Sequence, residues 1–370
     1  MTWRGFISII RRMPTLVDHL IKLTDHRERD LLELTLAKAL IDLLPIQRVV
    51  IARVMTEEGV SKWLEVASMD ASGGGKVVDP LRVDFDALPE VHEAADRLES
   101  LQTRRIVQVA WAGEEGPRIT YLPLFEETRG TDDGAVEIHS GRALAEADLL
   151  TMAQVLHVFR NMYNLLAYSD RDGLTGLLNR KALDDTFYSA VLEEMDESLP
   201  SAATRLEAPV APGSERRHRV PPNYWLGTIK VDRFVDVLEQ HGHLIGEEVL
   251  LLVARIVNNT FRTYDRLYRL GGEQFAVLMH CPEEPLVMLA FERFRANMEK
   301  FNFPQVGHLS ASGSFTRVSS EDSPDTALGR TERAVELSQQ GGGNKMFCYE
   351  ELVRTGQMGE KLTLSDINLF

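Results

Sequence analysis

The chain has 370 residues, 44% of them apolar and 26% charged, a composition typical of soluble globular proteins and a length that favours two domains. Its net charge of −15 argues against general nucleic-acid binding, which requires a basic face. Two cysteines are too few for a disulfide framework, and no apolar run approaches the ~18 residues of a transmembrane helix. We therefore expect a cytoplasmic protein with no integral membrane segment, no signal peptide and no nucleic-acid partner.

The first part of the chain has the pattern of an α+β domain over residues 1–143. Apolar residues at helical spacing across 15–44, interrupted near Asp25 and Arg27, predict a pair of helices. Strand-like segments follow, separated by turn signals such as the Ser-Gly-Gly-Gly run at 72–75. The expected strands are 48–55, 62–68, 76–83, 105–111, 119–124 and 135–139. A helix pair followed by an antiparallel sheet predicts a sheet packed on helices.

Residues 144–168 predict one long connecting helix, because their apolar residues recur mostly at spacings of three and four. Such a helix between two domains often pairs with a second copy, which would make the protein a homodimer. It can equally be a buried connector within one chain. The sequence leaves both alternatives open.

Alternating helices and strands predict a mixed-sheet α/β domain over residues 169–350. Within it, residues 197–222 are rich in Ser, Ala, Pro, Glu and Arg without periodicity, which indicates a flexible insertion. Residues 351–370 form a C-terminal tail. The expected helices are 181–195, 247–261, 286–301 and 327–340, and the expected strands are 225–231, 266–270, 275–279 and 307–317.

Gly271 and Gly272 lie between two apolar strands, which predicts a hairpin turn with positive φ angles. A backbone without side chains also lets a phosphate approach closely. A Gly-Gly hairpin alone is mostly a structural feature, so its functional meaning depends on the rest of the chain.

Residues from about 165 to 350 resemble the GGDEF domain, the fold of diguanylate cyclases. The matching segments are DGLTGLLNR at 172–180, DRF at 232–234, GHLIG at 242–246, GGEQF at 271–275 and GGN at 342–344. The family condenses two GTP molecules into cyclic di-GMP, with one GTP held by each domain of a dimer. Its phosphoryl transfer depends on metal ions that neutralise the phosphates.

The resemblance implies a damaged metal site, although Gly271 and Gly272 are retained. The family's metal-binding aspartate at the end of the first strand falls on Lys230. Each unit-charge pair at ~4 Å is worth about 4 kcal/mol at an effective dielectric of about 20. Replacing a negative by a positive charge beside a divalent metal ion therefore removes on the order of 10 kcal/mol of electrostatic interaction with that ion, before relaxation.

The resemblance also implies losses at the base and phosphate contacts. The guanine-reading asparagine falls on Leu238 and the guanine-reading aspartate on Glu247. In the signature, Glu273 keeps a carboxylate, but the next glutamate is replaced by Gln274, a poor magnesium ligand. The phosphate-binding lysine of the last helix falls on Gln339. We therefore expect no catalytic residues, no metal and no cofactor, and a protein that is not an enzyme.

Arg262-x-x-Asp265 lies five residues before the Gly-Gly pair, where the family keeps its product-inhibition site. Arginine can donate two hydrogen bonds to guanine O6 and N7, and a carboxylate can accept from N1 and N2. Arg293 falls near the position of the family's second arginine. The resemblance thus implies that Arg262, Asp265 and Arg293 bind cyclic di-GMP.

The first domain resembles a GAF domain in the order of its elements and its place before a GGDEF domain. It can hold a small-molecule pocket or serve only to dimerise or to bind a partner. The leading hypothesis is an inactive GGDEF protein that binds cyclic di-GMP and regulates an effector protein. The alternatives are an active cyclase with an altered metal site and a dimerising scaffold that binds no nucleotide.

Overall fold

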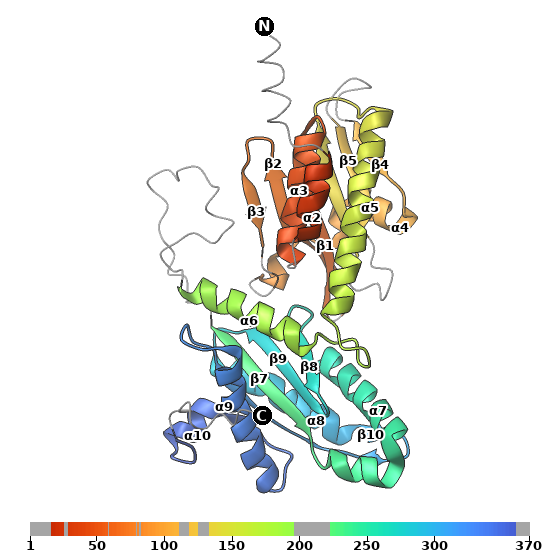
Figure 1. The fold of residues 1–370 in the computed structure, drawn as a ribbon. Helices are drawn as coiled ribbons and strands as arrows, with labels where there is room; N and C mark the ends of the chain where they lie inside the picture. Colours follow the sequence, from red (N-terminus) through yellow and green to blue (C-terminus); the bar gives the residue numbers. More distant parts are fainter. Residues whose placement is uncertain are drawn as a thin grey trace. The chain divides into compact units, whose positions relative to one another are not determined.

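The computed structural model describes residues 16–25, 29–57, 59–78, 80, 83–110, 118–124, 133–195 and 223–359. The expected insertion at 197–222 and most of the expected tail lie outside the described residues. The described chain divides into two compact units, with the boundary between Ser169 and Asp170. Figure 1 shows the elements of both units.

The first unit is built on an antiparallel sheet in the order β3-β2-β1-β6-β5-β4. The strand β1 lies in the interior of this sheet and is almost continuously buried from Val49 to Ala52. The strands are β1 (Ile46–Glu57), β2 (Val60–Asp70), β3 (Gly75–Val77), β4 (Val107–Ala110), β5 (Arg118–Leu124) and β6 (Gly134–Ser140).

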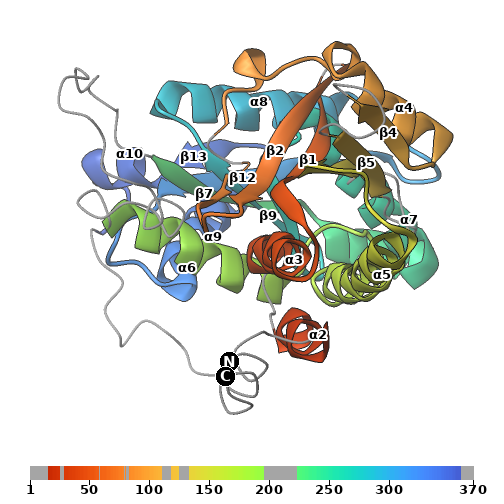
Figure 2. The ribbon, with the colours of Figure 1, turned by 90° about the horizontal axis from the view of Figure 1, so that it is seen from above.

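Helices cover both faces of this sheet (Figure 2). On one face α3 packs on β1 and β2, and α2 and α5 pack against α3; α4 packs on β4, β5 and β6 from the other side. The helices are α2 (Leu16–Asp25), α3 (Arg29–Leu43), α4 (Ala95–Thr103) and α5 (Glu146–Ser169), with short 3₁₀ turns η2 (Phe85–Ala87) and η3 (Val91–Glu93). The predicted helix pair and antiparallel sheet are both present.

A buried ion pair ties three of these elements together. Arg53 on β1 donates to Glu33 on α3, with a shortest N–O distance of 2.9 Å, and both side chains are nearly inaccessible to solvent. The Arg53 guanidinium also lies 4.6 Å from the centre of the Tyr163 ring on α5. At Tyr163 the helix α5 therefore packs against β1 of the same unit.

The second unit contains a mixed sheet in the order β13-β12-β7-β9-β8, in which only β12 and β13 are parallel. Its strands are β7 (Tyr224–Val231), β8 (Arg266–Gly271), β9 (Gln274–His280), β12 (Ala311–Arg317) and β13 (Met346–Cys348), with a separate hairpin of β10 (Asn302–Phe303) and β11 (Gly307–His308). The helices are α6 (Arg180–Met195), α7 (Phe234–Thr260), α8 (Glu284–Lys300), α9 (Pro324–Gln340) and α10 (Tyr349–Arg354).

The core of this unit lies between the sheet and the helices α7 and α8. Phe291 of α8 approaches the central strand so closely that a Cβ on Gly227 would lie 2.1 Å from its ring. Only glycine fits at this point of β7. A tightly packed apolar layer thus holds the central strand of the sheet against α8.

Three sequence predictions differ most from the structure in their boundaries. The helix expected to begin at residue 247 begins at Phe234. The prediction began too late because Gly242, with φ of 80° and ψ of 171°, interrupts the helix and breaks its apolar periodicity. The strand expected at 307–317 is divided between β11 and β12. The strand expected at 76–83 is limited to Gly75–Val77.

No helix in the described ranges combines the length and the apolar composition that a membrane span requires.

Candidate functional site

Gly271 and Gly272 form the turn between β8 and β9, with φ angles of 128° and 50° and open space where a Cβ would lie. L side chains rarely adopt these angles, which explains the two glycines. Arg269 closes the turn by donating to the Gly272 carbonyl at 3.0 Å from Nη2. The same guanidinium binds Asp172, at 3.0 and 3.1 Å from Nη1 to the two carboxylate oxygens.

Lys230 lies beside this turn at the end of β7, directly opposite Gln274 of β9. Its Nζ is 3.4 Å from Oε1 of Glu273, and both side chains are partly exposed. Gln274 is occupied as well, since its Nε2 donates to Glu332 of α9 at 2.8 Å. The sequence analysis did not identify Glu332. We name Lys230, Glu273, Gln274 and Gln339 the signature pocket.

Gln339 contributes to a hydrogen-bond network centred on Asp232, a buried carboxylate that follows β7. Its Nε2 donates to Asp232 Oδ1 at 3.3 Å, and hydroxyl groups of Ser310 and Ser312 donate at 2.7 Å each. A backbone N–H, that of Asn344, donates at 2.9 Å. Asp232 therefore joins the ends of three elements, β7, β12 and α9.

Glycine at position 343 belongs to the same arrangement. Gly343 has a φ of 75°, and a Cβ there would lie 2.8 Å from an oxygen of Asp232. The chain thus turns tightly against this carboxylate at Gly343.

Leu238 and Glu247 lie on α7, on either side of the break at Gly242. The Leu238 side chain packs so tightly over Gly246 that a Cβ there would lie 2.4 Å from its Cδ2. Leu238 therefore presents only hydrocarbon, while Glu247 is exposed to solvent.

Arg262 and Asp265 form a closed turn after α7. The Arg262 N–H donates to Asp265 Oδ2 at 2.9 Å, and the Asp265 N–H donates to the Arg262 carbonyl at 3.0 Å. Asp265 is consequently buried, with 9% of the residue exposed. The Arg262 side chain is exposed and donates from Nη1 to the Tyr264 hydroxyl at 2.6 Å.

Arg293 of α8 reaches the same turn. Its Nη2 donates to the carbonyl of Thr260, the last residue of α7 and only two positions before Arg262. The neighbouring Asn297 donates to the Thr260 hydroxyl at 3.0 Å. The structure therefore brings Arg262, Asp265 and Arg293 together, from the turn after α7 and from α8. We name residues 260–265 and Arg293 the arginine turn.

The surroundings shift the pKa of two side chains close to these regions, Asp172 and Cys281. Burial raises the pKa of Asp172, but hydrogen bonds from Thr175 and Arg269 outweigh it and hold the pKa below its usual value. Near the arginine turn, burial holds the pKa of the Cys281 thiol above its usual value, although a hydrogen bond to the Glu283 backbone and the charge of Arg262 oppose this shift. Within the described ranges, no three Asp, Glu, His or Cys side chains are grouped to hold a metal ion.

Residues 205–345 match the family model described as diguanylate cyclase, GGDEF domain. The chain carries a diguanylate cyclase-like GGDEF domain. The matched range contains the signature pocket and the arginine turn, so both belong to this domain.

Curated relatives of the GGDEF domain carry the same description. The chain is 28% identical over 193 residues to diguanylate cyclase DgcZ of Escherichia coli (strain K12), covering 51% of this chain and 57% of the relative. It is 27% identical over 178 residues to diguanylate cyclase DgcP of Pseudomonas aeruginosa, covering 47% of this chain and 23% of the relative. The chain thus spans about half or less of the length of these relatives.

Solved structures with similar folds include the GGDEF domain of DgcB from Caulobacter crescentus in complex with c-di-GMP. That match has 23% identity and a TM-score of 0.40, and it covers 49% of this chain and 94% of the other. Diguanylate cyclase SiaD of Pseudomonas aeruginosa, in complex with its activator SiaC, matches at 24% identity with a TM-score of 0.41, covering 55% of this chain and 72% of the other.

Proposed function

We propose that this GGDEF protein is a cyclic di-GMP receptor that does not synthesise the dinucleotide and that regulates an effector protein. The observation that carries the proposal is the Lys230–Glu273 ion pair, with its N–O distance of 3.4 Å. The Lys230 ammonium group lies beside Glu273, the carboxylate at the third position of the GGEQF segment. A charged amine cannot donate an electron pair to a metal ion.

The residues present do not fit the metal ions that the family's chemistry requires. A divalent cation beside Glu273 would be repelled by the Lys230 ammonium, and amide Gln274 is a weak ligand already bonded to Glu332. Asp232, two residues after Lys230, accepts hydrogen bonds from two hydroxyl groups and a backbone N–H. Its oxygens are therefore committed to the fold.

The arginine turn has the groups that recognise guanine. Arg262 and Arg293 are both exposed and both reach the end of α7, so two guanidinium groups can face one dinucleotide. In the proposal they donate to the guanine O6 and N7 atoms. Asp265 accepts from the guanine N1 and N2 edge while it also closes the turn that positions Arg262.

Calorimetric titration of the full chain with cyclic di-GMP tests this proposal. The Arg262→Ala variant should lose on the order of 100-fold in affinity, because each bidentate contact to guanine is worth about 1–3 kcal/mol and Arg262 also stacks on Tyr264. The matched control is Arg255→Ala, an exposed arginine on α7, the helix that precedes the turn. Unchanged affinity in Arg262→Ala, or an equal loss in Arg255→Ala, would reject the site.

An active cyclase remains the second candidate, because Glu273 keeps a carboxylate and the curated relatives are named diguanylate cyclases. Incubation with GTP and Mg²⁺ or Mn²⁺ separates the two functions. Product that scales with protein and disappears in Glu273→Ala would favour the cyclase.

A dimerising scaffold that binds no nucleotide is the third candidate. The helix α5 exposes Leu150, Leu165 and Tyr168, which a second copy of the chain can cover in a homodimer. Under this function the first unit acts as a GAF-like dimerisation module in the cytoplasm. Calorimetry that detects neither GTP nor cyclic di-GMP binding would favour it over the receptor.

A further inference from the structure

The first unit contains a cavity of about 290 Å³ at the edge of its sheet, on the strands β1, β2 and β3. It is far in sequence from the arginine turn and shares no residue with it. The lining residues are Arg48, Ser68, Met69, Asp70, Gly74, Gly75 and Lys76.

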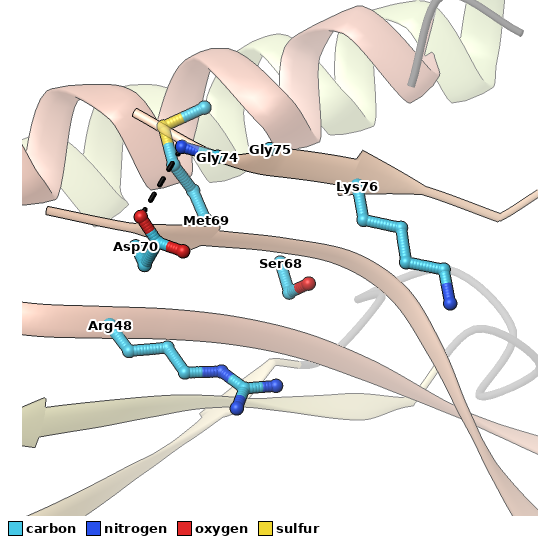
Figure 3. Close-up of a pocket in the computed structure, with 7 residues that line it drawn as sticks. All are labelled: Arg48, Ser68, Met69, Asp70, Gly74, Gly75 and Lys76. Atoms are coloured by element: carbon cyan, nitrogen blue, oxygen red, sulfur yellow. Dashed lines mark hydrogen bonds between the residues drawn. The ribbon is translucent and has the colours of Figure 1, made fainter. Parts of the chain in front are cut away.

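Strand register places three of the polar side chains on one face of the sheet. Arg48 of β1 lies opposite Asp70 of β2, and Ser68, two residues earlier, lies opposite Lys76 of β3. Because side chains alternate along a strand, Ser68 and Asp70 share a face, and so do their partners. Figure 3 shows Arg48, Ser68 and Lys76 extending to the same side, while Met69 points to the other.

The two cations are close enough to act on one ligand. Arg48 and Lys76 are two strands apart and offset by two residues, which separates their Cα atoms by roughly 12 Å. Both side chains are long and exposed, so their charged ends can converge over the Ser68 hydroxyl that lies between them.

Asp70, opposite Arg48 on β2, offsets part of the Arg48 charge, but neither cation of the cavity is held in a short ion pair within the described ranges. Two nearby basic residues do have a partner, since His139, opposite Arg48 on β6, binds Glu137 at 2.6 Å, and Arg97 of α4 binds the same carboxylate at 2.7 Å. Among the described residues, by contrast, neither Arg48 nor Lys76 has a hydrogen-bond or ion-pair partner.

The carboxylate in the cavity is committed to the turn that follows β2. Oδ1 of Asp70 accepts from the backbone N–H groups of Ser72 and Gly74 at 2.9 and 3.2 Å (Figure 3 shows the bond to Gly74). The Ser72 hydroxyl also donates to it and lowers the pKa of Asp70, which is therefore ionised at neutral pH. Two cations and one carboxylate leave the lining with an excess of one positive charge.

We propose that this cavity binds the phosphate group of a small phosphorylated metabolite. Arginine offers a planar fork of donors, lysine a compact charge and serine a hydroxyl donor, and a tetrahedral phosphate can accept from all three directions at once. The volume lies at the lower end of ligand pockets, which extend from about 300 to 1,000 Å³, so a small metabolite fits better than a dinucleotide. The first unit would thus carry a ligand site of its own.

Calorimetry of the full chain with glycerol 3-phosphate tests the proposal, with glycerol as the neutral counterpart. We expect saturable binding of the phosphate compound only, weakened roughly tenfold or more in Arg48→Gln and in Lys76→Gln. Arg105→Gln, an exposed arginine elsewhere in the same unit, should bind like the parent. Absence of saturable binding, or equal weakening in all three variants, would overturn the proposal.

Two further measurements identify the source of the phosphate and keep the result separate from cyclic di-GMP binding. Co-sedimentation with phosphatidylglycerol vesicles that Arg48→Gln abolishes, without binding of glycerol 3-phosphate, would overturn the metabolite in favour of a lipid headgroup. Cyclic di-GMP affinity should be the same in Arg48→Gln and the parent. A loss there would show that the variant damages the whole fold and that the exposed-cation argument is wrong.

Discussion

The signature pocket and the arginine turn belong to one domain but treat charge in opposite ways. In the signature pocket a cation, Lys230, pairs with the retained carboxylate, and Gln274 and Gln339 bond to carboxylates of the fold. In the arginine turn the carboxylate Asp265 is turned inward, and two guanidinium groups remain exposed. One domain can thus neutralise the charges of one site by internal ion pairs and hydrogen bonds, while the charged groups of another site face solvent.

Introducing two acids into the signature pocket should have the largest effect on its ligand binding. The double variant Lys230→Asp/Gln274→Glu should bind GTP with Mg²⁺ at least on the order of 100-fold more tightly than the parent. The reason is that the repulsion between the Lys230 ammonium and Mg²⁺ is replaced by attraction between Mg²⁺ and the new carboxylates. Calorimetry with a non-hydrolysable GTP analogue measures this gain. Cyclic di-GMP affinity should not change, because neither residue belongs to the arginine turn.

The control for this experiment is Lys230→Gln, which removes the positive charge without supplying a metal ligand. It should recover only a small part of the gain. A parent protein that already binds Mg²⁺ and GTP as tightly as the double variant would remove the contrast between the two regions.

A substitution at Asp265 tests whether this carboxylate contacts a guanine base or only closes the turn that holds Arg262. The Asp265→Asn variant keeps an oxygen that can accept the Arg262 N–H bond. Direct contact with guanine predicts at least a roughly tenfold loss of cyclic di-GMP affinity, since hydrogen bonds to charged groups are worth about 1.5–3 kcal/mol. Affinity within about twofold of the parent, measured by calorimetry, would leave Asp265 a positioning role only.

This ambiguity shows what the sequence could predict and what it could not. Apolar periodicity predicted the helices and strands around both regions, and the glycine pair predicted the β8–β9 turn. The break at Gly242 concealed the first half of α7, because two short helices at an angle do not share one apolar face. A sequence also does not distinguish a carboxylate that faces a ligand from one that caps its own turn.

Long-range partners were the other missing information. Gln339 bonds to Asp232, 107 residues away, and Gln274 bonds to Glu332, 58 residues away. Local patterns carry no record of such pairs. The sequence therefore predicted these positions as departures from the family pattern, whereas the structure describes the bonds that the residues at these positions make.

Acid should weaken the ion pair that joins Asp172 to Arg269, beside the turn between β8 and β9. Because the folded-state pKa of Asp172 is depressed, its ion pair with Arg269 stabilises the fold above pH about 4 and is lost as the pH falls through the folded-state pKa. Hydrogen exchange of β8 and β9 should show about 1–2 kcal/mol of lost protection at acid pH. Asp172→Asn should be less protected at neutral pH and should flatten this dependence; an identical pH profile would contradict the assignment.

The smallest effect is expected from Glu273→Gln, which removes the charge that pairs with Lys230. The two side chains are 38% and 23% exposed, and partly exposed pairs contribute at most about 1 kcal/mol. Hydrogen exchange of β7 and β9 should therefore change little, and cyclic di-GMP affinity should not change. The buried Arg53–Glu33 pair is the internal reference, because Glu33→Gln leaves an unpaired buried charge and should lower the free energy of unfolding by about 3–5 kcal/mol. If Glu273→Gln were as damaging as Glu33→Gln, the ion pair would be a structural element of the domain, and its presence would say little about the loss of metal binding.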